Sequence, residues 1–318
     1  MLKELKFVQG AVAKKDLLPA MTHFRIERGT VRSYNGVMAI GSPIALDIDC
    51  CPKADAMIKA IANCEDATTI TLTAGGRLSI KSGAFKALVP VIQDDTPHVE
   101  PAGDPIALDG EQLLAALRLL EPFIGTDASR PWTNGVLFSG QSAYATNNTC
   151  LVQYWLGSDF PGTINVPRAA VKEVLRVGEA PTHAQVDRSS ITFHYTDGRW
   201  IRTQLLETAW PMERIDAMLD QPANPQPVDP ALFAGLAKLK AMADGVGRVY
   251  MRDGALRTSN DDDEGASYEL SMAYTGCYNI QMLTLLEGVV TSIDMSLYPG
   301  PCLFFGERLR GAVIGMLM

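Results

Sequence analysis

The chain has 318 residues, of which 47% are hydrophobic and 20% are charged, and its formal net charge at pH 7 is −8. This composition is typical of a folded globular protein, and the length accommodates two or three domains. The acidic balance excludes a protein coated uniformly in basic side chains for nucleic-acid binding. It does not exclude a local basic surface.

The N-terminal segment and the cysteines indicate in which cellular compartment the protein is expected. Charges interrupt Met1-Leu-Lys-Glu-Leu-Lys-Phe7, so this segment does not resemble a secretory signal peptide. No apolar run reaches the roughly 18 residues that a membrane-spanning helix needs. The six cysteines form no CxxC pair and no Cys/His cluster with zinc spacing. We therefore expect a cytoplasmic protein without a membrane partner, whose reduced cysteines act as small hydrophobic residues.

The first hundred residues are predicted to contain two helices and several strands. A helix is expected at Lys14–Phe24, a strand at Gly29–Asn35 and a second helix from Pro52. A hairpin follows at residues 77–90, because apolar and polar residues alternate there. The turn-rich segment 94–105 is dense in proline, which is typical of a linker.

The middle of the chain follows the same order. A helix is expected at 110–123, a strand at Gln141–Asn147 and a second helix from Pro167 to the stop at Gly178. A hairpin with an Asp197-Gly198 turn occupies residues 190–206. A second proline-dense linker is expected at 219–230.

The helix after Pro167 has a cationic face. Arg168, Lys172 and Arg176 are spaced by four residues and lie within one arc, while the apolar residues lie on the other side. Its one acidic residue, Glu173, is expected beside this arc. A solvated helix face and a phosphate-binding face both fit this pattern.

The last hundred residues complete an internal repeat. A helix is expected at 230–244, a strand at Gly254–Asn260 and a second helix from Cys277. The asparagines that end the three repeated strands are 112 and 113 positions apart. This periodicity predicts an α+β fold of three similar domains, each with two helices packed on antiparallel sheets. We place the domains at residues 1–103, 104–222 and 223–318.

Several segments resemble the β subunit of bacterial DNA polymerase III, the DNA sliding clamp. Thr133-Asn-Gly-Val-Leu-Phe-Ser139 and Ala145-Thr-Asn-Asn-Thr-Cys-Leu151 are similar to the family's N-G-h-L-F strand and A-T-D-G-H-R-L turn. Ile164-Asn-Val-Pro-Arg168 resembles its V-I-V-P-R/K helix entry, and Thr203-Gln-Leu-Leu-Glu-Thr-Ala-Trp-Pro211 resembles its S-K-L-x-x-G-x-F-P segment. The C-terminal Arg310–Met318 falls where the family ends in V-M-P-M-R-L. The likeness covers nearly the whole chain and suggests a divergent or phage-encoded member.

The resemblance implies both a fold and a function. Two protomers would join head to tail as a homodimer, a ring whose helices line a central hole for duplex DNA. The protein would be a processivity factor in DNA replication, without catalytic activity or cofactor. Its partners would be double-stranded DNA, bound without sequence preference, and peptides of the DNA polymerase and the clamp loader.

The resemblance also implies two sets of site residues. The hole would be lined by Lys14, Lys15, Lys53, Lys59, Arg118, Trp132, Arg168, Lys172, Arg176, Lys238 and Lys240. Trp132 has a second interpretation, because a tryptophan is more often packed inside a domain than stacked on DNA. A partner-peptide pocket would be lined by Arg130, Thr146, Asn148, Thr149, Cys150, Leu151, Pro211, Ile314, Met316 and Met318.

The pocket departs from the family pattern in two places. The family's His-Arg pair is Thr149-Cys150 here, and its M-P-M-R-L tail is Ile314-Gly-Met-Leu-Met318. A pocket lined by adaptable methionines is still expected, with an altered peptide preference. Met316 and Met318 can equally be core or tail residues.

No catalytic or metal-binding pattern is recognisable. The four histidines are scattered without a partner at metal or triad spacing. Asp261–Glu264 lacks the glycine and final glutamate of a calcium loop, so it is expected to be a solvated loop. The alternatives to a sliding clamp are a non-encircling clamp-like scaffold that binds replication proteins and, third, an enzyme assembled from dispersed residues.

Overall fold

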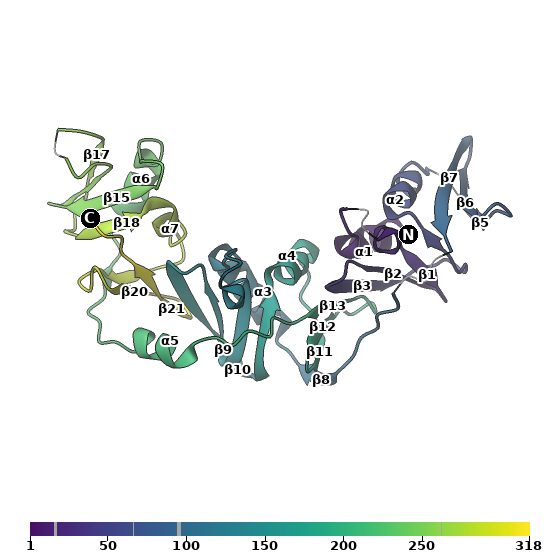
Figure 1. Cartoon of the computed structure of the whole chain (residues 1–318), viewed down its shortest axis with the longest axis horizontal. Helices are drawn as coiled ribbons and strands as arrows, with labels where there is room; N and C mark the ends of the chain where they lie inside the picture. Colours follow the sequence, from purple (N-terminus) through teal and green to yellow (C-terminus); the bar gives the residue numbers. More distant parts are fainter. Residues whose placement is uncertain (16–17, 66, 94–96, 262) are drawn as a thin grey trace. The chain divides into compact units, whose positions relative to one another are not determined.

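A computed structural model describes the whole chain except residues 16–17, 66, 94–96 and 262. The chain forms two compact units (Figure 1). Unit 1 consists of Met1–Leu114 with Ala169–Leu205, and unit 2 consists of Ala115–Arg168 with Leu206–Met318. Each unit is therefore built from two stretches that are far apart in the sequence, and helix α3 (Gly110–Leu120) crosses from one unit to the other.

Unit 1 is organised around a seven-stranded antiparallel sheet with the order β1-β2-β3-β13-β12-β11-β8. The strands are β1 (Arg25–Glu27), β2 (Thr30–Tyr34), β3 (Met38–Pro43), β8 (Asp104–Ala107), β11 (His183–Asp187), β12 (Ser190–His194) and β13 (Trp200–Gln204). The central pair, β3 and β13, joins the two stretches of chain, with Trp200 opposite Gly41. A Cβ on Gly41 would come within 2.3 Å of the indole, so only glycine allows this contact.

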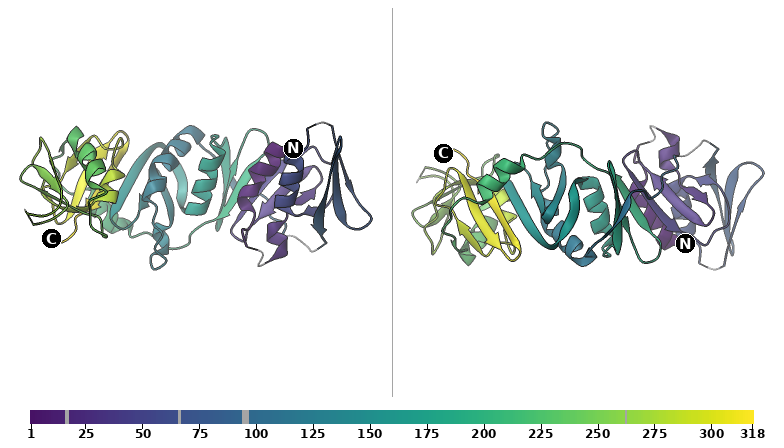
Figure 2. Two further views of the ribbon diagram at one scale, coloured as in Figure 1. Left: turned by 90° about the horizontal axis from the view of Figure 1, so that it is seen from above. Right: turned by 90° about the horizontal axis from the view of Figure 1, so that it is seen from below.

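A smaller antiparallel sheet in unit 1 has the order β4-β7-β6-β5. Its strands are β4 (Cys51–Pro52), β5 (Thr68–Leu72), β6 (Arg77–Ser82) and β7 (Phe85–Ile92). Helix α2 (Ala54–Ala62) packs against β7 of this sheet, and helix α1 (Leu2–Val8) lies beside α2 and packs against β2 and β3 of the larger sheet (Figure 2). Each helix buries one face: Leu5, Phe7 and Val8 in α1, and Met57, Ala60 and Ile61 in α2.

Unit 2 contains a six-stranded antiparallel sheet, β14-β19-β20-β21-β10-β9, and a four-stranded one, β17-β16-β15-β18. The first contains β9 (Gly135–Thr146), β10 (Cys150–Pro167), β14 (Gln226–Pro227), β19 (Ser292–Asp294), β20 (Pro301–Gly306) and β21 (Leu309–Ile314). The second contains β15 (Arg248–Arg252), β16 (Ala255–Arg257), β17 (Ser267–Glu269) and β18 (Gly276–Asn279). In the first sheet β10 pairs with β21, so the middle of the chain shares a sheet with its C-terminal part.

Unit 2 contains, besides the end of α3, three short α-helices within its described residues. They are α5 (Met212–Leu219), α6 (Pro230–Leu239) and α7 (Ile280–Thr284). The side chains of Ile215 and Leu219 in α5 are buried in one cluster with Leu137, Leu151 and Trp210. Helix α5 therefore packs on the face of the six-stranded sheet that β9 and β10 present.

The repeated asparagine forms the same turn in the first two repeats. The side-chain Oδ1 of Asn35 accepts hydrogen bonds from the backbone N–H groups two and three residues later, at 3.1 and 2.9 Å. Asn147 Oδ1 accepts the equivalent bonds at 3.1 and 2.8 Å. Each side chain thus fixes the turn into the next strand, which is the physical basis of this part of the sequence repeat.

The structure confirms the α+β fold with antiparallel sheets and most of the predicted elements. The hairpins at 77–90 and 190–206 are present, as are helices after Pro52, at 110–123 and after Pro167, where α4 (Arg168–Val177) begins. The helix predicted at 230–244 is present but ends at Leu239. The domain boundaries after residues 103 and 222 stay predictions.

Two predicted helices are wrong. The described residues of Lys14–Phe24 contain no α-helix, and the first helix is α1 instead. Pro19 inside that segment lacks an N–H group and disfavours a helical residue before it, so it opens a single 3₁₀ turn, Pro19–Thr22. The helix expected from Cys277 begins at Ile280, because the preceding residues pair with β15 as strand β18.

Asp229 secures the start of α6. Its carboxylate is 3% exposed and accepts hydrogen bonds from the N–H of Ala231 at 2.9 Å and from the N–H and Oγ of Ser271 at 2.8 and 2.7 Å. Burial alone would raise the pKa of this carboxyl group, but the hydrogen bonds from Ser271 and the backbone outweigh burial and lower it. The charged form therefore contributes to the stability of unit 2.

Replacing Asp229 with alanine should lower the free energy of unfolding by about 1–2 kcal/mol at pH 7, since a helix cap and several hydrogen bonds are lost. Because the folded pKa is lowered, this contribution is complete above about pH 4 and is lost as the pH falls through the folded pKa. Urea denaturation of both proteins at pH 7 and pH 3 measures the difference. An equal difference at both pH values would contradict this role.

Candidate partner-binding pocket and nucleic-acid interface

Unit 2 contains an apolar cavity of about 180 Å³ between the six-stranded sheet and α5. Its lining consists of Arg130, Trp132, Thr146, Asn148, Thr149, Cys150, Leu151, Ile215, Met218, Ala312 and Ile314. The structure thus brings together seven of the residues expected in the peptide pocket, namely Arg130, Thr146, Asn148, Thr149, Cys150, Leu151 and Ile314. We refer to this cavity as the α5 pocket.

The floor of the α5 pocket is set by strand register. Leu151 of β10 lies opposite Thr146 of β9 and opposite Ala312 of β21. Directly opposed residues point to the same face of a sheet, so these three side chains form one row across the floor. Ile314 lies two residues after Ala312 and therefore on the same face, and its N–H donates to the carbonyl of Thr149 at 2.9 Å.

The rim of the pocket is polar and carries one positive charge. Arg130 is exposed and donates from Nη1 to Asn148 Oδ1 at 3.0 Å. Asn148 has a φ of 71°, a left-handed conformation that asparagine tolerates better than most residues. Below the rim, Cys150 is fully buried, and burial raises the pKa of its thiol to about 12. The thiol is therefore neutral at pH 7 and acts as part of the apolar wall.

Helix α5 forms the opposite wall with Ile215 and Met218. Sequence analysis missed these residues, because no helix was predicted there. A signal was present: Met212, Ile215 and Met218 recur at intervals of three directly after Pro211, as on one helix face.

Trp132 lies in the wall of the α5 pocket. Its ring packs edge to face on Trp210, with the ring centroids 5.0 Å apart, and Trp210 is itself buried. This position agrees with the second interpretation of Trp132, a tryptophan packed inside its domain. Trp132 therefore lines the α5 pocket, and a contact of this residue with DNA stays a prediction.

Three residues expected in the pocket do not line this cavity. Pro211 is exposed and precedes the first residue of α5. Met316 is fixed away from the floor, since its N–H donates to the carbonyl of Cys277 and its carbonyl accepts from Tyr298 OH, both at 2.7 Å. Met318 is exposed, which agrees with the tail interpretation.

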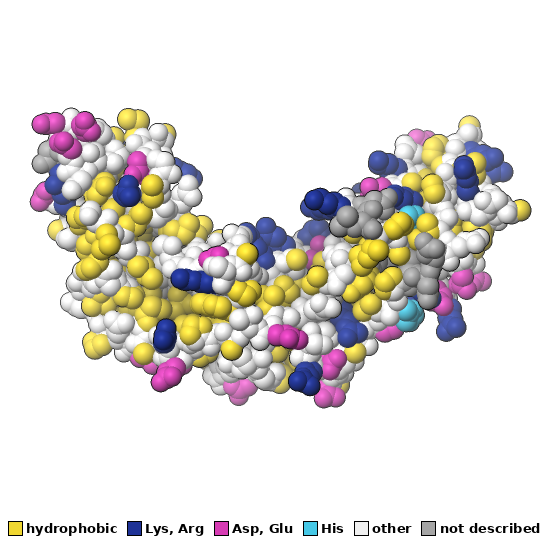
Figure 3. Space-filling model, viewed as in Figure 1, with side chains coloured by type: hydrophobic (Ala, Val, Ile, Leu, Met, Phe, Trp, Pro, Cys, Tyr) yellow, Lys and Arg dark blue, Asp and Glu magenta, His cyan; other side chains and the backbone are white. Residues whose placement is uncertain are grey.

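The expected DNA-binding residues occur in both units. Unit 1 contains Lys14, Lys15, Lys53, Lys59, Lys172 and Arg176, and unit 2 contains Arg118, Arg168, Lys238 and Lys240. Lys14 and Lys15 are exposed but lie in an irregular segment, whereas Lys59 and Lys238 project from helices α2 and α6. In Figure 3, Lys and Arg side chains gather over α2 and α4.

Arg176 is tied to its own helix and to α1. Its Nε donates to both carboxylate oxygens of Glu173 at 2.9 and 3.0 Å, and its Nη2 donates to the carbonyl of Phe7 at 2.8 Å. Glu173 is 7% exposed and lies against Gly10, where a Cβ would meet the carboxylate at 1.7 Å. Glu173 thus lies beside the basic arc, as expected, but the sequence did not predict that it is buried and that it pairs with Arg176.

Helix α1 supplies basic residues that sequence analysis did not select. Lys3 and Lys6 are exposed on α1, and Lys6 lines a polar cleft of about 580 Å³ together with Lys14 and Arg176. The spacing of Leu2, Leu5 and Val8 in the sequence indicates the helix, but the predicted helix at 14–24 obscured it.

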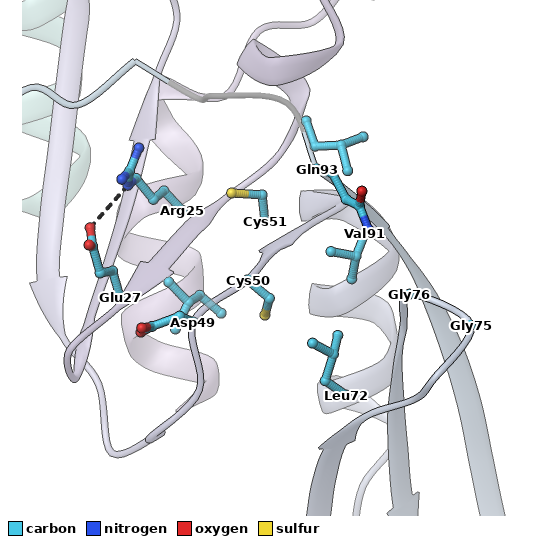
Figure 4. Close-up of a pocket in the computed structure, with 12 residues that line it drawn as sticks. Arg25, Glu27, Asp49, Cys50, Cys51, Leu72, Gly75, Gly76, Val91 and Gln93 are labelled. Atoms are coloured by element: carbon cyan, nitrogen blue, oxygen red, sulfur yellow. Dashed lines mark hydrogen bonds and ion pairs between the residues drawn. The ribbon is translucent and has the colours of Figure 1, made fainter.

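A further cavity of about 690 Å³ in unit 1 carries no recognisable chemistry (Figure 4). Arg25 and Glu27 form an ion pair at its edge, with 3.1 Å between Nε and Oε2. The side chains of Cys50 and Cys51 point in different directions, and burial raises the pKa of Cys50 to about 12. Among the described residues, no group of three or more His, Cys, Asp or Glu side chains could hold a metal ion.

The described part of the chain contains no helix that is both long and apolar enough to cross a lipid bilayer. This agrees with the hydropathy of the sequence.

The chain is similar in structure to several solved proteins over its full length. The DNA polymerase III subunit β from Pseudomonas aeruginosa matches with a TM-score of 0.84 at 15% identity. The Caulobacter crescentus pol III β matches with a TM-score of 0.85 at 16% sequence identity. The DnaN sliding clamp from Bartonella birtlesii bound to griselimycin matches with a TM-score of 0.83 at 16% sequence identity. Each match covers 100% of this chain and 97% of the other. No protein-family model and no curated protein matches the sequence. The chain therefore has the fold of the β sliding clamps.

Replacing Glu173 with glutamine should lower the free energy of unfolding by about 1–3 kcal/mol, because Arg176 would lose its charged acceptor. The exposed residue Glu65 provides a matched control, and Glu65→Gln should change the free energy by less than about 0.5 kcal/mol. Urea denaturation at pH 7 measures both. Equal effects of the two substitutions would show that the buried pair does not hold α4 against α1.

Proposed function

We propose that this protein is a DNA sliding clamp of the DNA polymerase III β family, acting in the cytoplasm as a processivity factor in DNA replication. One observation carries the proposal: the clamp fold covers the whole chain, with TM-scores of 0.83 to 0.85. In this proposal three domains, at residues 1–103, 104–222 and 223–318, repeat in each of two protomers. The ring encloses duplex DNA and has no catalytic role.

Duplex DNA is bound through its phosphates in this proposal. Lysine and arginine side chains attract phosphate by a salt-sensitive interaction that carries no sequence information. The net charge of −8 repels DNA from the rest of the surface. Glu173 compensates the charge of Arg176, and we add the exposed residues Lys3 and Lys6 of α1 to the predicted set.

Exposed apolar residues support a head-to-tail homodimer. Leu72 and Leu88 are exposed in the small sheet of unit 1, and β7 is joined to β4 only at Val91 and Ile92 within the described residues. In unit 2, Met242 and Val246 are exposed after α6. An open strand edge with exposed apolar side chains is a common site of association. Contacts between two unlike surfaces close into a ring when the rotation allows it.

The α5 pocket receives a peptide of the DNA polymerase or of the clamp loader. Its interior of Leu151, Ile215 and Met218 fits apolar side chains, and Arg130 at the rim favours an acidic group beside them. The volume of about 180 Å³ is small, so one or two side chains fill it. The related Bartonella birtlesii clamp binds griselimycin, which gives a probe for this pocket.

A non-encircling scaffold that binds replication proteins remains the second candidate function. It would use the same pocket, but it would need neither the second copy nor the hole. The two candidates differ in whether the topology of the DNA controls retention.

If the protein forms a ring around DNA, it should stay on a circular DNA molecule and slide off a linear one. Protein loaded on nicked circular DNA should remain bound during gel filtration at a salt concentration that abolishes phosphate contacts, and cutting the circle should release most of it. Gel filtration before and after linearisation measures this. Equal retention on circular and linear DNA, or a solution mass of one protomer at micromolar concentration, would favour the scaffold.

If the α5 pocket binds a ligand, a charged side chain introduced into its wall should weaken that binding. Ile314 lines the α5 pocket and is 42% exposed, so Ile314→Asp should fold and should weaken griselimycin binding by about ten-fold or more. Leu317 is 83% exposed and does not line the pocket, and Leu317→Asp is the matched control. Titration calorimetry measures both affinities. Equal affinities would place the ligand elsewhere.

A further inference from the structure

The C-terminal end of helix α5 carries the pocket residue Met218 and ends at the buried residue Leu219. The helix has eight residues, and the last carbonyl groups of any helix lack partners within it. At its N-terminal end, the carbonyl of Pro211 accepts from the N–H groups of Arg214 and Ile215 at 3.0 and 3.1 Å. Ile215 and Leu219 are buried, whereas Met218, which lines the pocket from the last turn, is only partly buried. Leu219 holds the last turn against the sheet, and a polar contact at the same turn would further restrict the position of Met218.

Arg310 of β21 provides that contact. Its Nη1 donates to the carbonyl of Leu219, the last residue of α5, at 3.3 Å and to Asp220 Oδ1 at 2.8 Å. Its Nε donates to Gln153 Oε1 of β10 at 2.7 Å. A cation is favourable at a helix C-terminus, and the planar guanidinium can bond two elements at once, which a lysine ammonium does less well.

Gln153 holds the guanidinium in place from the other side. Its Nε2 donates to Ser142 Oγ at 2.9 Å and to Tyr144 OH at 3.0 Å, so both ends of its amide are bonded. Tyr144 in turn lies beside Trp210, with 6.4 Å between ring centroids. The network thus extends from β9 through β10 and β21 to the end of α5.

Strand register puts this network next to the α5 pocket. Gln153 lies opposite Arg310, two residues along both strands from the opposed pair Leu151 and Ala312. Residues two apart on a strand share a face and are separated by roughly 7 Å. Arg310 therefore lies on the same sheet face as the pocket floor, although it does not line the cavity.

We propose that Arg310 is a positioning residue of the α5 pocket: it fixes the last turn of α5, and with it Met218, at the distance from the sheet that a ligand requires. The inference rests on the proposed partner-binding role of the pocket. Burial of Ile215 and Leu219 does not depend on the guanidinium, so a chain without it should stay folded. The carbonyl of Leu219 and the side chain of Asp220 would lose their donor, and Met218 would gain freedom of movement.

Arg310→Gln tests the proposal, with Arg308→Gln as the matched control. Arg308 lies two residues earlier, in the turn between β20 and β21. Its guanidinium carbon lies 5.0 Å from the centroid of the Trp155 ring, and it has no bond to α5 among the described contacts. Hydrogen exchange of residues 212–220, followed by mass spectrometry, should accelerate about ten-fold or more in Arg310→Gln and stay unchanged in Arg308→Gln. Griselimycin binding should weaken by roughly five- to thirty-fold in Arg310→Gln alone.

Asp220→Asn keeps an acceptor for Arg310 and should retain exchange close to that of the native chain. Unchanged exchange of residues 212–220 in Arg310→Gln would overturn the proposal. Acceleration spread over all of unit 2 would also overturn it, because Arg310 would then be a general stability residue. If the native chain does not bind griselimycin, the proposed pocket function is weakened, and the exchange experiment still decides whether Arg310 positions α5.

Discussion

Backbone pairing between distant strands is the constraint on which the rest of this structure depends. β3 pairs with β13, and β10 pairs with β21, in each case across more than a hundred residues of chain. The floor of the α5 pocket exists only because Leu151 lies opposite Ala312. A slip of one residue would turn every side chain of β21 to the other face and would remove the floor. The buried faces on both sides of these sheets make such a slip costly.

Several cations in this protein join elements of the structure, and only some are available to a ligand. Arg176 connects α4 to α1 through Glu173 and the carbonyl of Phe7. Arg310 connects β21, β10 and α5. A basic side chain whose charge is already compensated contributes little to phosphate attraction. The number of basic residues on a helix is therefore a poor guide to its ligand.

The side chain of Asn147 fixes the backbone of the turn that carries the pocket residues Thr149 and Cys150. The side chain of Asn147 accepts from the N–H groups of Thr149 and Cys150, so the path of the chain does not depend on which side chains those two positions carry. Thr149 and Cys150 stand where the resembling family has a histidine and an arginine. Thr149 and Cys150 are uncharged, whereas Arg130 brings a positive charge to the rim of the pocket. An altered peptide preference of this pocket stays a prediction.

The sequence by itself determined the features that depend on neighbours along the chain. The asparagine turns, the hairpins and the helix after Pro167 follow from local spacing and turn chemistry. The resemblance located seven residues of the α5 pocket but not the helix that forms its opposite wall. Only the tertiary structure decided the burial of Glu173, because its contacts with Gly10 and with Phe7 through Arg176 come from residues more than 150 positions away. The same holds for Trp132, whose place depends on Trp210, and for α5, whose short apolar pattern gains its meaning from the sheet beneath it. Periodicity records which side of an element is apolar; which partner covers that side is set by packing between distant segments.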